Sequence, residues 1–189
     1  MANIKITLEL DDELIADYLG GFSEAYEEVE KCLHALADGN TDEEIYNEML
    51  RHLHSIKGNA RMCELRIPEK IAHVIESVVI KVKEGGIAYF PDLGETIHVS
   101  LDKVKETSLA AFNNETIDEA AYEQLITILD SICNDLSKVK ELTNHFLHLT
   151  TGVPLVSDQH VESTQADQDF NEKELDILKM IGNRLKPNE

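Results

Sequence analysis

Residues 52–64 read HLHSIKGNARMCE, a stretch of helix-forming sequence with its polar groups at helical spacing. At about 100° per residue, the apolar positions of residues 45–63 gather on one side of a helix. His54 points about 145° away from that side, with Lys57 and Gly58 close to it. The stretch therefore predicts an amphipathic helix with an exposed histidine midway along its outer face.

The sequence on both sides of this helix repeats the same apolar periodicity. Apolar residues recur at three- and four-residue steps in four further segments, at residues 15–36, 71–82, 93–104 and 122–146. The last segment predicts one long helix that starts near Asp118. Five amphipathic helices joined by short turns indicate an all-α fold, an antiparallel helix bundle of the four-helix type.

Turn and capping residues mark where these helices begin and end. Thr41 and Glu44 form a capping box that opens the helix with His54. Pro68 occupies a first-turn position of the next helix. Pro91 falls in the loop before the fourth helix, and Asn113-Asn114 breaks the pattern after it.

The chain divides into three parts by composition. Residues 1–148 are predicted to form the helical bundle, preceded within that part by a short extended arm at residues 4–10, where apolar and polar residues alternate. Residues 149–169 are rich in Ser, Thr, Asp and Gln and predict a flexible linker. Residues 170–189 predict a short terminal helix or the start of a truncated region.

Composition restricts the classes of partner and the compartment. The formal net charge of −20 over 189 residues argues against nucleic acid and anionic lipid as partners. The first residues, MANIKITLELDDEL, are acidic where a signal peptide would need an apolar run, and no apolar run approaches about 20 residues. The three cysteines form no CxxC pair, which favours reduced thiols. We therefore predict a cytoplasmic protein without membrane contact, and a monomer, because the long last helix is needed to cover the others.

The residues around His54 are suited to handling a phosphoryl group. A glycine inside an exposed helix costs about 1 kcal/mol relative to alanine, so Gly58 is expected to allow another molecule to approach closely. A neutral imidazole is nucleophilic near pH 7 because its unperturbed pKa is about 6.5. Lys57 can steady phosphate oxygens as a point charge. A convex helix surface with these groups favours phosphoryl transfer over a substrate pocket.

The motif HSIKGNA at residues 54–60 resembles the H-S-I/L-K-G-x-A signature of histidine-containing phosphotransfer (HPt) domains. It is most similar to the N-terminal phosphotransfer domain of CheA-type chemotaxis kinases. The resemblance extends from about Leu10 to Leu142 and includes the acidic lead-in LDDELIADYLGGFSEAYEEVEKCL and the later segment AHVIESVV.

The resemblance implies a role for each residue that matches the family's pattern. His54 would take the phosphoryl group on Nε2, and Glu76 would accept a hydrogen bond from the Nδ1–H of that ring, which holds the tautomer. Lys57 would assist the phosphate, and His73 would complete the hydrogen-bonded cluster. Gly58 would keep the approach to the ring open.

The chain departs from the family pattern at two positions near the motif. Glu64 stands where family members often have glycine, and Arg61 stands where many have a small residue. Arg61 is therefore assigned, with Gly58, to partner docking. The resemblance implies a histidine phosphotransfer protein of a two-component phosphorelay, with a response-regulator receiver domain or a sensor histidine kinase as partner.

No cofactor or metal is expected on this chain itself, and Mg²⁺ is expected on the partner. The chain has no phosphate-cradling glycine motif, so we expect no ATP-dependent kinase activity. It would be either a free-standing relay protein or the front part of a longer kinase.

Two other functions are alternatives to phosphotransfer. A metal-binding bundle could draw on His52, His54, His73 and the many carboxylates. However, His52 and His54 lie about 200° apart on the helix and could not share one ion. The remaining alternative is a helical interaction module whose histidine is never phosphorylated.

Overall fold

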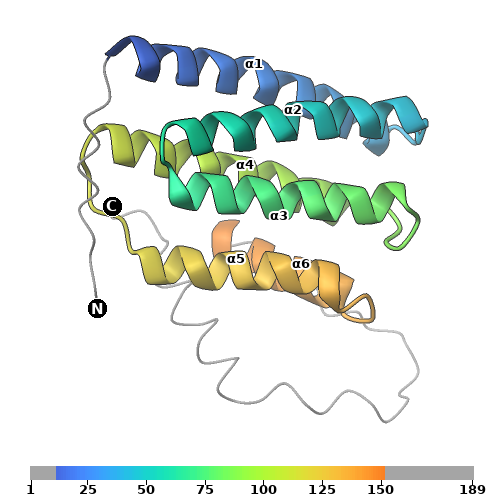
Figure 1. Cartoon of the computed structure of the whole chain (residues 1–189). Helices are drawn as coiled ribbons and strands as arrows, with labels where there is room; N and C mark the ends of the chain where they lie inside the picture. The colour runs from blue at the N-terminus through green and yellow to red at the C-terminus, as the bar shows by residue number, and fades with distance from the viewer. Residues whose placement is uncertain (1–11, 152–189) are drawn as a thin grey trace.

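The computed structural model describes residues 12–151, which fold into six α-helices (Figure 1). Along the chain these are α1 (Asp12–Ala37), α2 (Glu43–Met62), α3 (Arg66–Lys83), α4 (Pro91–Phe112), α5 (Glu119–Asn134) and α6 (Val139–Thr151). Within these residues there is no strand, and the predicted all-α fold is confirmed.

The helices form a four-helix bundle with a helical hairpin packed against it. Each of α1 to α3 packs on the helix that follows it, and α4 closes the bundle by returning to α1. In the hairpin, α5 packs on α3, α6 packs on α4, and the two helices contact each other. Figure 1 shows the hairpin on the side of α3 that faces away from α1 and α2.

The core is mostly aliphatic, as the composition predicts. On α2 the side chains that face inward include Leu53 and Ile56, which are both almost completely buried. Because this stripe is occupied by the core, residues on the opposite side of α2 are left on the surface. The largest fully buried side chains are Phe146, Met49, Leu53, Ile56, Leu65, Ile67, Ile71, Ile75, Leu93, Leu101, Leu125 and Leu129.

Helices α1 to α4 all end in the same backbone motif. After the last turn one residue takes a positive φ, and the next residue donates its N–H to a carbonyl five positions back, as Leu65 does to Ala60 at 2.9 Å. This is the Schellman motif, which reverses the chain within a few residues. The left-handed positions are Gly39 (φ 87°), Glu64 (φ 54°), Gly85 (φ 74°) and Asn114 (φ 53°).

The prediction of one long fifth helix is wrong, because the chain turns between α5 and α6. The Asp135 carboxylate accepts hydrogen bonds from the backbone N–H of Ser137 (3.2 Å) and from its hydroxyl (2.5 Å). This local turn competes with helix continuation. Leu136, which the periodicity assigns to the buried stripe, is 52% exposed. The apolar repeat continues across the turn because α5 and α6 both face the core.

Two predicted helix starts also need correction. Thr41 does not cap α2, because α2 begins at Glu43 and Asp42 precedes it without a side-chain capping bond. Instead the Asn40 side chain accepts a hydrogen bond from the Asp42 N–H at 3.1 Å. Pro91 is the first residue of α4 rather than part of the preceding loop. Its missing N–H is harmless there, because the first N–H groups of a helix have no partner within the helix.

The segments predicted for the two ends of the chain lie largely outside the described residues. The predicted arm at residues 4–10 and the terminal helix at residues 170–189 lie there entirely. Of the predicted linker, residues 149–151 belong to α6, and the remainder is outside the described part. Within residues 12–151, no helix combines the length and apolar character needed to span a bilayer.

Candidate functional site

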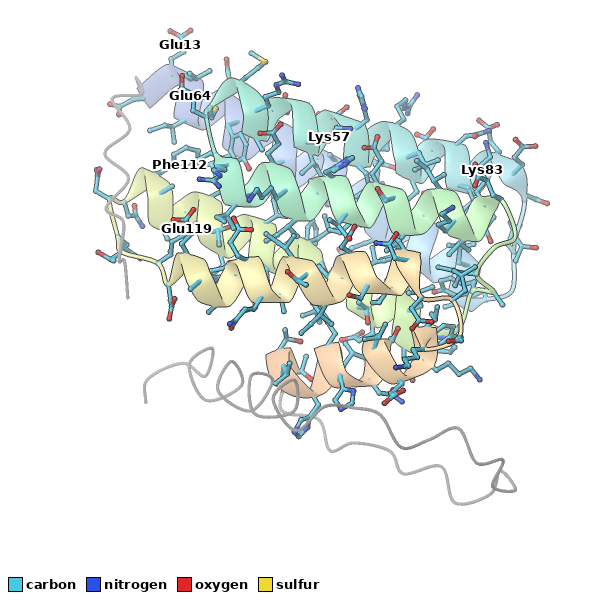
Figure 2. All side chains as sticks on the ribbon, turned by 60° about the horizontal axis from the view of Figure 1, so that its bottom comes forward. Glu13, Lys57, Glu64, Lys83, Phe112 and Glu119 are labelled. Carbon is cyan, nitrogen blue, oxygen red and sulfur yellow. The ribbon has the colours of Figure 1, made fainter. Side chains whose placement is uncertain are left out.

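Helix α2 places His54 on the surface, as its spacing predicts. The neighbouring Leu53 is fully buried, and the His54 side chain is 71% exposed. Lys57, one turn further along, leans toward α3 and is partly buried. Figure 2 shows Lys57 on the face that α2 and α3 form together. The ring and the amine thus share one open surface.

Glu76 on α3 connects the two α2 side chains. Its Oε1 lies 3.1 Å from Nδ1 of His54, and its Oε2 accepts a hydrogen bond from the Lys57 ammonium group. The Glu76 side chain is only 13% exposed, although the histidine it contacts faces solvent. The predicted contact between His54, Lys57 and Glu76 is therefore present in the structure.

The antiparallel register of α2 and α3 fixes this contact. Three pairs of residues join the two helices, and their order along α2 is the reverse of their order along α3. The pairs are Asn47 with Lys83 (2.7 Å), His54 with Glu76 (3.1 Å) and Arg61 with Glu69 (3.9 Å). The short turn that contains Glu64 sets the register, and Figure 2 shows Glu64 and Lys83 at opposite ends of the helix pair. A shift by one residue would turn Glu76 away from the ring.

The charge on Glu76 determines which nitrogen of His54 carries the proton. Burial raises the pKa of the Glu76 carboxyl, but the hydrogen bonds and positive charge supplied by Lys57 and His54 outweigh that effect and lower it. The carboxyl is therefore ionised near neutral pH. An ionised carboxylate can only accept hydrogen bonds, so Nδ1 of His54 is the donor. That tautomer leaves the lone pair on Nε2, and the His54 side chain that carries it is 71% exposed.

His73 lies at the edge of this cluster. Its Nδ1 is 3.9 Å from Oε2 of Glu76, which is an ion-pair distance but too long for a hydrogen bond. The ring is mostly exposed, one turn before Glu76 on α3. His73 is thus near the predicted cluster without being hydrogen-bonded into it.

Gly58 and Arg61 occupy the surface beyond the ring. A Cβ atom added at Gly58 would meet nothing within 4 Å, so packing inside this chain does not require the glycine. Arg61 is highly exposed and approaches Glu69 rather than Glu76. Both residues border the site, and neither contacts the His54–Glu76 pair.

The alternative of a metal-binding bundle receives no support from the described residues. Among them, no group of three or more His, Cys, Asp and Glu side chains is placed to hold a metal ion. His52 contacts Glu48 on its own helix at 3.1 Å and is partly buried. His52 and His54 thus face different surroundings, as their separation of about 200° on the helix predicts.

The sequence prediction missed the apolar side chains that border the site. Ile80 on α3 is 38% exposed, and the α2/α3 register places it opposite Leu50, one turn from the His54–Glu76 pair. Periodicity within one helix could not reveal this neighbourhood, because it depends on the pairing of two helices. An isoleucine outside the apolar stripe of its helix was the available signal.

Comparison with known proteins finds a family model that matches part of the chain. The model of the Hpt domain matches residues 21–107, and this confirms the resemblance inferred from the HSIKGNA motif. The chain is 33% identical to a chemotaxis protein CheA of Rhizobium meliloti over 107 residues, which are 57% of this chain and 14% of the relative.

Two further relatives match over longer stretches. The sensor histidine kinase CheAY of Helicobacter pylori is 28% identical over 142 residues, which are 71% of this chain and 18% of the relative. The chemotaxis protein CheA of Salmonella typhimurium is 25% identical over 178 residues, which are 94% of this chain and 24% of the relative. The chain thus spans less than a quarter of the length of these curated relatives.

A solved structure has the same fold. It is the phosphorylated P1 domain of CheA3 in complex with CheY6 from R. sphaeroides, with a TM-score of 0.57 and 24% sequence identity. The similarity covers 66% of this chain and 98% of that one. At this identity the likeness establishes the helical architecture.

Proposed function

We propose that the protein is a phosphorelay intermediate that carries a phosphoryl group on His54, because the model of the Hpt domain matches residues 21–107. The group is exchanged with an aspartate of a response-regulator receiver domain. One observation carries this proposal: an exposed imidazole whose Nδ1 lies 3.1 Å from an ionised carboxylate, so that Nε2 is free to react.

The proposed step is a phosphoryl exchange between two protein side chains. The Nε2 lone pair of His54 attacks the phosphorus of a phospho-aspartate, the P–N bond forms, and the bond from phosphorus to the aspartate oxygen breaks. The aspartate leaves as a carboxylate. Positive charge develops on the imidazole ring and is stabilised by Glu76, which is already in place at Nδ1. The reverse step returns the group by the same atoms.

Two further residues complete the proposed chemistry. Lys57 neutralises phosphate oxygens in the transition state and also holds Glu76 in place, because its ammonium group already contacts that carboxylate. His73 lies within ion-pair distance of Glu76 and adds to the positive charge around the arriving phosphate when it is protonated.

The partners supply what this chain does not. The donor is a phosphorylated receiver domain or a sensor histidine kinase, and Mg²⁺ is expected on that partner. The relatives leave open whether this sequence acts alone or as the phosphotransfer part of a longer kinase. We place the protein in the cytoplasm as a monomer, in keeping with its three buried, free thiols.

A transfer assay tests the proposal directly. Receiver domains charged with acetyl phosphate are incubated with the purified protein, and the phosphoryl group is traced by its label. The expected product is an acid-labile, alkali-stable label on the wild type that is absent from a His54→Gln variant. Glutamine keeps a polar side chain of similar reach, so the variant is expected to remain folded.

Two results would contradict the proposal. Equal labelling of the His54→Gln variant would place the phosphoryl group on another residue. A wild-type protein that stays unlabelled with every receiver tested, and with phosphoramidate as a small-molecule donor, would leave the non-phosphorylated interaction module as the better description.

A further inference from the structure

Large apolar side chains are exposed at four places in the described part of the chain. These are Met62 (72% exposed), Ile80 (38%), Leu109 (37%) and Leu136 (52%). The first two lie on either side of His54, whereas Leu109 is on α4 and Leu136 is in the α5–α6 turn. We propose that Ile80 and Met62 are the apolar contacts that bind a receiver domain over His54. This inference rests on the proposed function.

Ile80 borders the site on the side of α3. The register defined by Asn47–Lys83 and His54–Glu76 sets Ile80 opposite Leu50, one helical turn from the reactive ring. One turn corresponds to about 5.4 Å along a helix. Leu50 is half-buried and packs on the core. The register thus sets two apolar residues, Leu50 and Ile80, beside His54.

Met62 borders the site on the side of α1. It lies eight residues after His54 on α2, which is about 12 Å along the helix axis. Met62 forms one wall of an open groove of about 120 Å³ between the start of α1 and the end of α2. Gly58 lies between His54 and Met62 and has open space above it. The groove is lined by Leu14, Asp17, Tyr18, Asn59, Met62 and Cys63.

The geometry of phosphoryl transfer determines what must cover these residues. The donor atom, the phosphorus and Nε2 of His54 must lie in line, with reacting atoms about 3–3.5 Å apart. A standard protein interface covers about 800 Å² on each partner, which is a disc of about 16 Å radius. An interface centred on His54 therefore covers Ile80 and reaches Met62.

Burial of these two side chains would contribute to the affinity. Apolar side chains near the centre of an interface lose their water and bind most strongly when the partner offers a matching surface. The occupant that we infer is a receiver domain with apolar side chains on both sides of its phospho-aspartate. Receivers that carry charged side chains there would be rejected, so Ile80 and Met62 would select among receivers.

The chain offers matched controls for the test. Ile80→Lys is paired with Leu109→Lys, because both residues are helical and almost equally exposed. Met62→Lys is paired with Leu136→Lys, because both lie at a helix end or turn and are at least half exposed. Each variant is labelled on His54 with phosphoramidate, which needs no docking surface. Transfer to a panel of CheY-type receiver domains is then timed.

We expect Ile80→Lys and Met62→Lys to lower the kcat/KM of transfer to the preferred receiver at least tenfold. Leu109→Lys and Leu136→Lys should change it less than twofold, and phosphoramidate should label all four variants at the wild-type rate. Equal effects of the site variants and their controls would overturn the inference. Self-association of the wild type that Ile80→Lys abolishes without slowing transfer would assign this surface to a second copy of the chain.

The outcome for the wild type separates this inference from the function on which it rests. A wild-type protein that phosphoramidate labels but that transfers to no receiver overturns the proposed function. A wild-type protein that transfers normally, and whose Ile80→Lys and Met62→Lys variants do the same, overturns the docking surface alone.

Discussion

At the scale of single residues, Glu76 determines the reactivity of the site. Its two oxygens serve different partners, because Oε1 contacts the His54 ring and Oε2 contacts the Lys57 amine. A largely buried carboxylate would be costly without these contacts, and the lowered pKa of Glu76 shows that the two partners more than offset its burial. The same contacts that stabilise Glu76 therefore orient the nucleophile.

Replacing Lys57 by alanine tests whether the amine acts on the phosphate. We expect Lys57→Ala to slow transfer both to and from His54 by about tenfold to a hundredfold, because charge on the phosphate oxygens is no longer neutralised. The bundle should stay folded with a loss of about 1–3 kcal/mol, because the largely buried Glu76 carboxylate loses one of its two partners. Stopped-flow transfer rates and urea unfolding measure the two effects.

Lys103→Ala is the matched control for this variant. Lys103 is also partly buried and pairs with a glutamate, Glu106, at 2.6 Å, but it lies on α4. It should lose less stability, because its partner Glu106 is 54% exposed, and it should not slow transfer. Transfer rates for Lys57→Ala equal to those for Lys103→Ala would remove Lys57 from the mechanism.

Gly58 offers a test in which stability and function should change in opposite directions. Its added Cβ would meet nothing within 4 Å, so Gly58→Ala should stabilise α2 by about 1 kcal/mol. Gly58→Leu should also fold well, but its side chain would fill the approach to His54. We expect receiver-dependent transfer to fall at least tenfold in Gly58→Leu, with little change in phosphoramidate labelling.

Gly20 on α1 provides the comparison. It is equally free of neighbours within 4 Å, and Gly20→Leu should leave transfer unchanged. If Gly58→Leu transferred as fast as Gly20→Leu, the open space above Gly58 would have no part in docking.

At the scale of helices, the end of α2 contains an unfavourable residue. Glu64 occupies the left-handed position of a Schellman motif, where the other helix ends of the bundle have two glycines and one asparagine. A residue with a Cβ atom pays roughly 1–2 kcal/mol for this conformation. The turn that sets the α2/α3 register requires the left-handed conformation at residue 64. The chain therefore tolerates the strain at Glu64.

Glu64→Gly should therefore stabilise the protein by about 1 kcal/mol, since glycine adopts the positive φ without a steric penalty. Urea unfolding followed by circular dichroism measures the change. Gly85→Ala makes the opposite change at the matching position after α3 and should destabilise by a similar amount. A Glu64→Gly variant no more stable than the wild type would mean that Glu64 makes compensating contacts at this turn.

Apolar periodicity predicts the helices well where it runs through a single helix, and poorly where a local turn ends a helix while the periodicity continues. The exposed position of His54 follows from α2 alone, and the structure agrees. The break at Asp135 was missed because the apolar pattern continues through it. The contact of Glu76 with His54 depends on register, so the resemblance to a family was needed to predict it, and Ile80 escaped both kinds of reasoning.

At the scale of the whole molecule, buried tyrosines connect α4 to its neighbours. Tyr18 on α1 bonds to Ser108 at 2.7 Å, and Tyr122 on α5 donates to Glu106 at 2.7 Å. Burial raises the pKa of both hydroxyls, to about 12 for Tyr18, and the Glu106 carboxylate raises that of Tyr122 further. These bonds join the four-helix bundle and the hairpin through one helix.

The raised pKa values predict that the fold loses stability in alkali. Between pH 10 and about 12, Tyr18 keeps its proton in the folded protein and loses it in the unfolded chain. The unfolded state then binds fewer protons, so the free energy of unfolding falls as pH rises. For Tyr18 alone the loss reaches about 2–3 kcal/mol across this window, and below pH 10 it is absent.

Tyr18→Phe isolates the contribution of this one hydroxyl. The variant should be about 1 kcal/mol less stable at pH 7, because a buried hydrogen bond is lost while the Ser108 hydroxyl keeps its bond to the Val104 carbonyl at 2.7 Å. Its stability should then decline less steeply than that of the wild type above pH 10. Urea unfolding from pH 8 to 11.5, with tyrosinate absorbance at 295 nm, measures both slopes. Parallel declines would mean that Tyr18 ionises at its ordinary pKa and that the α1–α4 contact opens to solvent.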